Sequence, residues 1–234
     1  MKIALLGYGR MGKEIEKIAI SRGHEIVIKK DQGDTVDIKL ADVAIDFSVP
    51  SAAFDNISLC LNNGVPVVSG TTGWLEKYDE AVQLCNQNKG GFIYASNFSL
   101  GVNIFFEINK QLAKMMDQVS DYTTAIEEIH HTKKLDAPSG TAITLAEGII
   151  ENSKKSEWQL DGDVNNETSI PITAKRIPDV PGTHTISYDS EVDSIEIKHT
   201  AHSRKGFALG AVIAAEWIIG KSGVFSMRDV LNIS

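Results

Sequence analysis

The sequence predicts an α/β protein in which a Rossmann-type, doubly wound parallel sheet carries an inserted α+β domain with an open mixed sheet. Short apolar runs alternate with helical patterns from residue 2 to 95, and a G-x-G-x-x-G loop directly follows the first run. After Val102 the rhythm changes, and three strand-like runs follow one another without helices between them. Alternating strands and helices favour a parallel sheet with right-handed crossovers, whereas consecutive strands favour an open sheet.

The composition is that of an ordinary globular protein of one large or two modest domains. The 234 residues are 42% hydrophobic and 23% charged. A formal net charge of −8 argues against nucleic-acid or anionic-membrane binding. Cys60 and Cys85 lie among apolar neighbours, without the spacing of a metal site or a disulfide framework. No apolar run approaches the ~20 residues that span a bilayer, and no signal-peptide pattern is present. A cytoplasmic location is therefore expected.

A dinucleotide-binding loop is expected near the start of the chain. A strand over residues 2–6 enters Gly7-Tyr8-Gly9-Arg10-Met11-Gly12, a helix ended by Gly23 follows, and a second strand covers 25–29. In this context Gly7 permits the tight turn, Gly9 lets a pyrophosphate approach the backbone, and Gly12 lets the helix pack on the sheet. The alternative, a plain glycine-rich turn, is disfavoured by the strand before it and the helix after it.

The end of the second strand bears on the choice of cofactor. An acidic residue that holds the ribose hydroxyls of NADH is expected there, but the chain places Lys29 and Lys30 before Asp31. These lysines and Arg10 can pair with a 2′-phosphate, so NADPH is expected to be accepted, while Asp31 leaves NADH open. Solvated strand-end charges are the alternative for the lysines.

The strand–helix pattern continues to residue 95. Strands are expected over 43–48, 65–69 and 92–95, and helices over 52–62 and 76–88. The small, hydroxyl-rich loop Gly70-Thr71-Thr72-Gly73 lies at the carboxyl end of a strand, where open parallel sheets bind ligands.

One later segment predicts a pocket for a small polyanion. A strand over 124–129 ends in His130 and His131, Lys133 and Lys134 follow, and Ser139-Gly140-Thr141 opens a helix that extends to about residue 153. Free N–H groups and the dipole at a helix start attract anions, and histidine exchanges protons near neutral pH. The alternatives are that Ser139 only caps the helix, that the lysines are solvated, and that one histidine is a core residue.

The remainder predicts the second domain and a return to the first. A polar linker is expected over 154–168, then strands over 170–177, 183–188 and 194–200, then an apolar helix over 207–219. We expect a dinucleotide-binding domain over 1–100, a substrate-binding and oligomerisation domain over 101–204, and a segment over 205–234 that returns to the first domain.

The segment EIHHTKKLDAPSGTA closely resembles the signature of the 4-hydroxy-tetrahydrodipicolinate reductase (dihydrodipicolinate reductase) family. Four further segments are similar to that family: the glycine loop, one residue shorter here, the Gly70–Gly73 loop, the segment NFSLGVN, and the region around Ser203 and Arg204. The resemblance implies reduction of a small cyclic dicarboxylate with hydride from NADPH or NADH in lysine biosynthesis. It also implies a homotetramer that assembles through the sheet of the second domain.

The resemblance also implies the site residues. His130 is expected as the general acid, with Lys134 as its electrostatic partner and second proton source. The substrate carboxylates are expected on His131, Lys134, Ser139, Gly140 and Thr141. The cofactor is expected on the following residues: Gly7, Tyr8, Gly9, Arg10, Met11, Gly12, Lys29, Lys30, Gly70, Thr71, Thr72, Ala95, Ser96, Asn97 and Phe98.

Four alternatives stay open at this point. Lys133 can exchange roles with Lys134 in a loop of different register. A metal site on His130, His131 and Glu127 or Glu128 is disfavoured and no metal is expected, because adjacent histidines lack the i, i+4 spacing of many zinc sites and no third ligand has a suitable spacing. A dehydrogenase acting on a different substrate and a dinucleotide-binding sensor without activity are the other functions. The DAPSGT helix start argues against the former, and the presence of both His130 and Lys134 argues against the latter.

Overall fold

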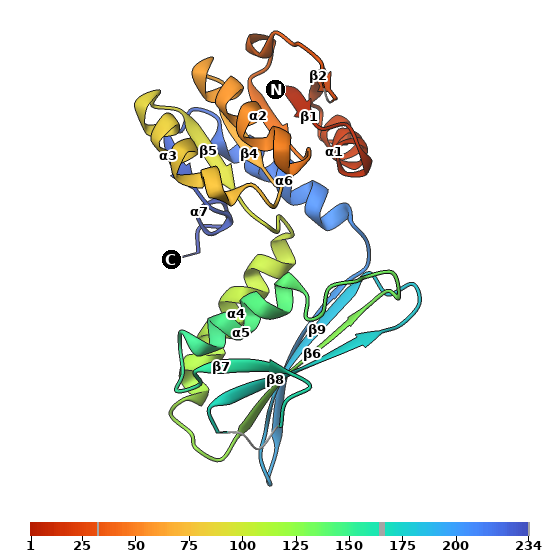
Figure 1. The fold of residues 1–234 in the computed structure, drawn as a ribbon, viewed down its shortest axis with the longest axis vertical. Coiled ribbons are helices and arrows are strands. Elements are labelled where there is room, and N and C mark those ends of the chain that lie inside the picture. Colours follow the sequence, from red (N-terminus) through yellow and green to blue (C-terminus); the bar gives the residue numbers. More distant parts are fainter. Residues whose placement is uncertain (32, 164–166, 234) are drawn as a thin grey trace. The chain divides into compact units, whose positions relative to one another are not determined.

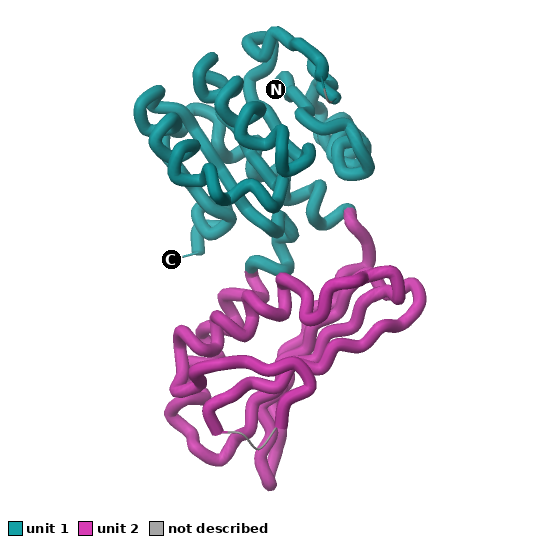
Figure 2. Tube along the Cα trace, viewed as in Figure 1, with its two compact units in different colours: residues 1–103, 205–234 teal, residues 104–204 magenta. Residues whose placement is uncertain are grey.

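The computed structural model describes residues 1–31, 33–163 and 167–233. The chain forms two compact units, residues 1–103 with 205–234 and residues 104–204 (Figure 2). The expected polar linker includes residues 164–166, which lie outside the described residues.

The first unit is built on a parallel sheet with the strand order β11-β5-β4-β3-β1-β2 (Figure 1). Its helices and strands are β1 (Lys2–Leu6), α1 (Arg10–Ser21), β2 (Glu25–Lys30), η1 (Ile38–Leu40), β3 (Val43–Asp46), α2 (Pro50–Asn62), β4 (Val67–Ser69), η2 (Leu75–Lys77), α3 (Tyr78–Gln87), β5 (Gly91–Tyr94), α6 (Lys205–Ile218), β11 (Gly223–Phe225) and α7 (Met227–Val230).

Helices cover both faces of this sheet, as its apolar strands require. Every residue of β3 is buried, which is typical of a central parallel strand with both faces covered. One face packs against α1, α6 and α7, and the other against α2 and α3. The predicted doubly wound sheet is confirmed. Residues 205–234 belong to this unit, and β11 pairs in parallel with β5 at the edge of the sheet.

The second unit is built on a mixed sheet with the order β10-β9-β6-β8-β7. Its elements are α4 (Leu100–Met116), which begins in the first unit, then β6 (Thr123–His130), α5 (Gly140–Ile150), β7 (Glu157–Leu160), β8 (Ser169–Arg176), β9 (Gly182–Asp189) and β10 (Ser194–Ala201). Strand β6 pairs in parallel with β8 and antiparallel with β9. Helices α4 and α5 pack against the sheet side by side, and Asn109 Nδ2 donates to the carbonyl oxygen of Leu145 at 2.9 Å. The predicted open mixed sheet is confirmed.

The linker prediction was wrong over residues 157–160. These residues form β7, an edge strand that pairs in parallel with the start of β8. Trp158 and Leu160 alternate with exposed residues and are half-buried, because only one face of this edge strand has a partner. With so few apolar positions the segment has the composition of a loop.

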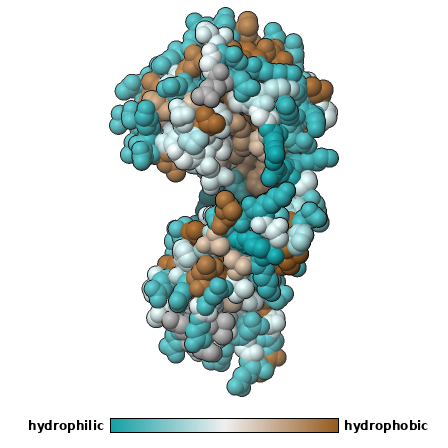
Figure 3. Space-filling model, turned by 45° about the vertical axis from the view of Figure 1, so that its right-hand side comes forward, coloured by the Kyte–Doolittle hydropathy of each residue, from teal (hydrophilic) through white to brown (hydrophobic). Residues whose placement is uncertain are grey.

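None of the described helices combines the length and apolar character that a membrane span requires. On the face drawn in Figure 3, hydrophilic residues cover much of each unit, with apolar residues scattered among them. Among the large apolar side chains that the structure describes, Leu135 and Val192 are the most exposed, at 97% and 86%.

Candidate active site

The glycine loop between β1 and α1 has the shape of a phosphate-binding turn. Gly7 has φ of +97°, and a Cβ there would lie 2.2 Å from the carbonyl oxygen of Phe47. A Cβ at Gly12 would lie 2.3 Å from the carbonyl oxygen of Gly7, whereas a Cβ at Gly9 would meet nothing within 4 Å. Gly9 is the N-cap of α1, and no side chain caps this helix start. The uncapped amides and the open space above Gly9 fit the pyrophosphate of a dinucleotide.

Asp46 organises the loops that follow β3 and β4. Its fully buried carboxylate accepts hydrogen bonds at 2.7–2.9 Å from four side chains: Ser48, Asn56, Ser69 and Thr71. Thr71 Oγ1 in turn accepts a hydrogen bond from the amide of Ser48 at 2.8 Å. The expected Gly70–Gly73 loop is therefore held by Asp46 at the carboxyl edge of the sheet, on the same edge as the glycine loop. Thr71 is buried, whereas Thr72 is exposed.

The two lysines at the end of β2 have partners inside the chain. Lys29 Nζ lies 2.6 Å from Oε1 of Glu16 on α1 and 4.9 Å from the centroid of the Tyr8 ring. Lys30 Nζ donates to Oδ1 of Asn56 at 2.9 Å. Arg10 is exposed at the first position of α1. The structure therefore leaves Arg10 as the cation of the loop that is least constrained by a described neighbour.

The segment after β5 is held by hydrogen bonds between asparagine side chains and the backbone of the same segment. Asn97 Oδ1 accepts a hydrogen bond from the amide of Ser99 at 2.9 Å, and Asn103 Nδ2 donates to the carbonyl oxygens of Asn97 and Ser99. Phe98 is buried, and its ring lies 5.7 Å from the ring of Phe47. Ala95 is half-buried and Ser96 is exposed. Of the expected cofactor residues, Arg10, Met11 and Gly12 lie on α1 and Lys29 and Lys30 end β2, whereas the others follow the carboxyl ends of parallel strands.

In the second unit, His130 lies in a buried cluster with Glu128, which the sequence analysis considered only as a metal ligand, and with His184, which it did not single out. His130 Nδ1 lies 3.5 Å from Oε2 of Glu128, and His184 Nε2 lies 3.7 Å from the same oxygen. The two imidazole rings are 5.1 Å apart at an interplanar angle of 71°. All three residues are at most 8% exposed. His131, the next residue, is half-buried.

Ser139 caps α5, as one of the alternatives for this residue required. Its Oγ accepts a hydrogen bond from the amide of Ala142 and lies 3.2 Å from Nε2 of His184. Its own amide donates to Oε2 of Glu128 at 3.1 Å. The side chain and the amide of Ser139 therefore have partners within the unit. The amides of Gly140 and Thr141, at the first two positions of α5, remain for an anion.

The loop between His130 and Ser139 carries Lys134 and is tied to β8. Lys134 Nζ lies 2.8 Å from Oδ2 of Asp136, and its side chain is 22% exposed. Arg176 on β8 donates through Nη2 to Oε1 of Glu128 at 3.2 Å and to the carbonyl oxygen of Asp136 at 2.6 Å. Lys133 is exposed, whereas Lys134 is half-buried. The geometry therefore favours Lys134 over Lys133 as the lysine that lies beside His130 in the candidate site.

The surroundings of the cluster lower the pKa values of both Glu128 and His130, so that the carboxylate is charged while the imidazole is neutral. Burial opposes ionisation of Glu128, but the neighbouring His184, the hydrogen bond from Ser139 and the charge of His130 outweigh it and lower the pKa of Glu128 to about 2. Burial lowers the pKa of His130 to about 4; Glu128 opposes this shift, whereas His184, Lys134 and Arg176 add to it. At neutral pH the cluster therefore holds an ionised carboxylate beside a neutral imidazole.

The same three residues are the group of described side chains with the spacing of a metal site. His184 supplies the third ligand atom that the sequence analysis did not find. A cation there would face the guanidinium of Arg176 and the positive end of α5, which both favour anions. We therefore assign no metal to this cluster.

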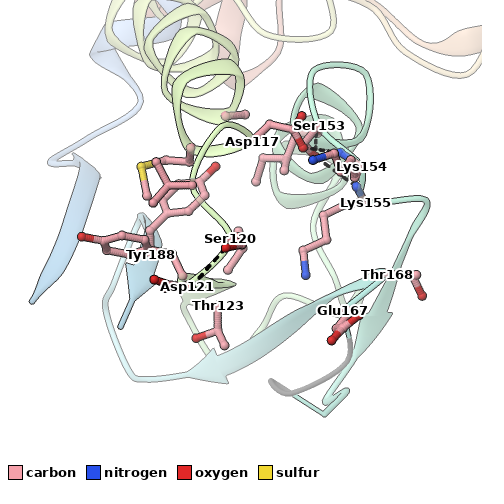
Figure 4. A pocket seen from close by; sticks show the side chains of 16 residues that line it. Asp117, Ser120, Asp121, Thr123, Ser153, Lys154, Lys155, Glu167, Thr168 and Tyr188 are labelled. Atoms are coloured by element: carbon pink, nitrogen blue, oxygen red, sulfur yellow. Dashed lines mark hydrogen bonds between the residues drawn. The ribbon is translucent and has the colours of Figure 1, made fainter. Parts of the chain in front are cut away.

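A pocket of about 520 Å³ lies at the other end of β6 (Figure 4). Its lining includes Thr123 at the start of that strand, together with Lys155, Glu167 and Tyr188. Figure 4 shows Lys154 and Lys155 on one side of the hollow and Tyr188, Asp121 and Thr123 on the other. His130 ends the same eight-residue strand, so the pocket is roughly 20 Å from the histidines. It is not part of the histidine site.

A Rossmann-type sheet with a phosphate-binding turn, together with a buried histidine beside an open helix start on a second sheet, defines a pyridine-nucleotide-dependent oxidoreductase. Models of the dihydrodipicolinate reductase N-terminus and C-terminus match residues 1–98 and 101–231. The chain belongs to the dihydrodipicolinate reductase family, which confirms the resemblance seen in the sequence.

Three relatives illustrate the similarity. The 4-hydroxy-tetrahydrodipicolinate reductase of Christiangramia forsetii is 59% identical over 237 residues, which cover 99% of this chain and 98% of that protein. The 4-hydroxy-tetrahydrodipicolinate reductase of Methanosarcina acetivorans is 38% identical over 240 residues, 99% of this chain and 89% of that protein. The dipicolinate-bound dihydrodipicolinate reductase from Paenisporosarcina sp. TG-14 is 25% identical, with a TM-score of 0.77 and coverage of 100% of this chain and 99% of that one.

Proposed function

We propose that this chain reduces 4-hydroxy-tetrahydrodipicolinate, through its dehydrated form, to tetrahydrodipicolinate in the diaminopimelate route of lysine biosynthesis, using NADH or NADPH. The observation that carries the proposal is the position of His130, one carboxylate away from the start of α5. Glu128 thereby contacts both the proposed proton donor, His130, and the amide of Ser139 at the start of α5, which is proposed to bind a substrate carboxylate. The family membership and the binding of dipicolinate by a solved relative support a small dicarboxylate as substrate.

The first unit is proposed as the cofactor domain. When bound, the reduced nicotinamide supplies the hydride. The uncapped amides of α1 hold the pyrophosphate, and the Gly70–Gly73 loop, positioned by Asp46, lines the cofactor site together with Ala95, Ser96, Asn97 and Phe98. Arg10 is the cation best placed to meet a 2′-phosphate, because Lys29 and Lys30 already have partners.

The second unit is proposed as the substrate domain. Gly140 and Thr141 offer amides at the positive end of α5 to one carboxylate, and His131 and Lys134 face the substrate from the loop before it. Ser139 contributes by shaping the helix start, because its amide and hydroxyl are already used within the unit. Lys134 must exchange part of its contact with Asp136 to reach a ligand.

His130 is proposed as the general acid. Hydride addition to a conjugated imine builds electron density that a nearby proton neutralises. In the unliganded protein the pKa of His130 is about 4, because burial disfavours the imidazolium. Two substrate carboxylates add negative charge nearby and raise that pKa, since an opposite charge favours the charged form. Substrate binding therefore favours protonation of His130, which is the form that can act as a general acid.

The assembly and the location remain proposals as well. We infer a homotetramer, supported by the edge strand β10, which is largely exposed along its length. Light scattering coupled to size exclusion tests this state, and a monomer would contradict it. We also infer a cytoplasmic location, which cell fractionation tests.

The direct test follows nicotinamide oxidation at 340 nm, with substrate generated in place by the preceding synthase and with NADH and NADPH run in parallel. Turnover with either cofactor supports the proposal. His130→Gln is expected to lower kcat far more than it changes the KM of the cofactor, whereas the exposed control Lys133→Met leaves both near wild type. Cofactor binding without any turnover overturns the proposed reaction.

A further inference from the structure

Glu128 is a fully buried carboxylate two residues before His130 on β6. Residues two positions apart on a strand point to the same face of the sheet. His184 lies directly opposite Glu128 in the ladder between β6 and β9, so its side chain shares that face. Three titratable side chains from two strands therefore meet at one buried point.

The two ring nitrogens of His130 have different surroundings. Nδ1 is buried, faces Oε2 of Glu128 at 3.5 Å, and makes no hydrogen bond with the described residues. Nε2 lies against the buried Gly182, where a Cβ would come within 3.1 Å, so the glycine lets the ring approach the backbone of β9. Because Nδ1 is buried, the 10% of the side chain that stays exposed lies elsewhere on the ring. Since a ligand cannot reach Nδ1, Nε2 is the nitrogen left to exchange a proton.

We propose that Glu128 is a positioning residue for His130, holding a proton on Nδ1 and stabilising the imidazolium so that Nε2 gives its proton to the substrate. In this step the Nε2–H bond of His130 breaks and a carbon of the substrate gains the proton, while another carbon of the substrate ring gains the hydride from the cofactor. His130 is left neutral, with its remaining proton on Nδ1. A carboxylate acts in this way in Ser-His-Asp sites, where it fixes the tautomer and stabilises the charged ring.

The charges around His130 make this role necessary. His184 on β9, Arg176 on β8 and Lys134 in the following loop all disfavour the imidazolium, as does burial. Glu128 opposes them, with its Oε2 3.5 Å from Nδ1. Without its charge, burial and three repulsive neighbours remain, and the acid form becomes harder to reach.

The same carboxylate also fixes the start of α5. Its Oε2 accepts the amide of Ser139 at 3.1 Å, and its Oε1 accepts from Arg176 at 3.2 Å. Glu128 therefore keeps the proton donor and the carboxylate-binding amides in one register. This coupling explains why a carboxylate is kept in a region otherwise built for anions.

The test uses Glu128→Gln, which removes the charge and keeps the shape. The matched control is Glu127→Gln, because Glu127 is adjacent on β6, points to the other face, and pairs with the half-exposed Lys175. In ¹⁵N-histidine spectra, wild type and control are expected to carry the His130 proton on Nδ1, and Glu128→Gln to lose that preference and to lower the pKa of His130. At pH 7 kcat is expected to fall about 100-fold in Glu128→Gln, the low end of general-acid effects, with the KM of the cofactor unchanged.

Two results overturn the proposal: a wild-type ring protonated on Nε2 when neutral, or a folded Glu128→Gln with wild-type kcat. The first needs no variant, so the proposal stays testable even where Glu128→Gln does not fold. The kinetic arm rests on the proposed function, whereas the tautomer arm does not. Wild-type protein that lacks turnover but carries the proton on Nδ1 contradicts the reaction and supports the placement of His130 by Glu128.

Discussion

Arg176, which is half-buried, and the fully buried Glu128 form an ion pair across neighbouring parallel strands, with Nη2 3.2 Å from Oε1. The same nitrogen donates to the carbonyl oxygen of Asp136 at 2.6 Å, and Nε reaches the carbonyl oxygen of Lys134 at 3.4 Å. Arg176 therefore ties the buried carboxylate to the loop that carries Lys134 and leads into α5. A planar guanidinium with several donors can serve these partners together, which a single ammonium group cannot.

Arg176→Lys is expected to weaken substrate binding more than it slows the chemical step. Loss of a charge-assisted hydrogen bond costs roughly 1.5 kcal/mol, so the KM of the dicarboxylate is expected to rise about 10-fold while the KM of the cofactor stays the same. Steady-state kinetics with the substrate varied measure this. Lys175→Met, one residue away on the other face of β8, is the control and leaves both constants near wild type. An unchanged substrate KM in Arg176→Lys would show that the loop holds its position without the guanidinium.

Asp46→Asn is expected to destabilise the first unit by about 3 kcal/mol, because a buried acceptor of several donors loses its charge and gains an N–H group that faces them. Urea unfolding at pH 7 measures the change. Asp42→Asn is the control, since Asp42 accepts one exposed hydrogen bond from the amide of Lys2, and it is expected to cost less than about 1 kcal/mol. A cost for Asp46→Asn no greater than that of the control contradicts the role of Asp46 in holding the two loops.

The sequence predicted those features that a few neighbouring residues determine. The glycine loop, the alternation of strands and helices up to residue 95 and the start of α5 at Ser139 all have local signals, because turn and cap chemistry acts within about four residues. Arg176 and Glu128 stand 48 positions apart, and no local pattern relates them. Their meeting is set by the register between β6 and β8, which follows from packing of the whole sheet.

Two further differences have the same cause. Lys29 and Lys30 look like free strand-end charges, yet Glu16 on α1 and Asn56 on α2 meet them once the helices pack on the sheet. His184 follows a Pro-Gly turn and has no catalytic motif of its own, and it reaches the site through its pairing with Glu128. The site residues expected from the sequence stay predictions, whereas the residues that contact them became apparent only from the packing of the strands and helices.

Glu216 on α6 is expected to make the first unit more stable above pH 5 than at pH 4. Its carboxylate accepts two hydrogen bonds from Arg22 at 2.7 Å each and contacts His24, and these contacts lower its pKa against the opposing effect of burial. A depressed folded pKa contributes stability above the unfolded value of about 4.5, and that stability is lost as the pH falls through the folded pKa. The gain is at most about 1 kcal/mol, because solvent screens a pair in which Arg22 is 39% exposed.

Denaturant unfolding of wild type and Glu216→Gln between pH 3 and 7 measures this contribution. The stability difference between the two proteins is expected at pH 7 and to vanish toward pH 3. Comparing the two proteins at each pH removes the effect of the other carboxylates that protonate in the same range. A difference that does not depend on pH would assign the effect to packing between α1 and α6.

Arg10 is expected to decide the response to the 2′-phosphate of NADPH, because Glu16 already neutralises Lys29 at 2.6 Å and Asn56 holds Lys30. Arg10→Gln is expected to raise the KM of NADPH about 10-fold, the loss of one charge-assisted hydrogen bond, with little change for NADH. Glu16→Gln frees Lys29 and is expected to lower the KM of NADPH about threefold, since an exposed ion pair holds the lysine only weakly. Parallel kinetics with the two cofactors separate these effects from any general loss of dinucleotide binding, which would raise both KM values together. If Lys29→Gln raises the KM of NADPH more than Arg10→Gln does, then Lys29 leaves Glu16 when the phosphate binds, and the lysine rather than the arginine reads the cofactor.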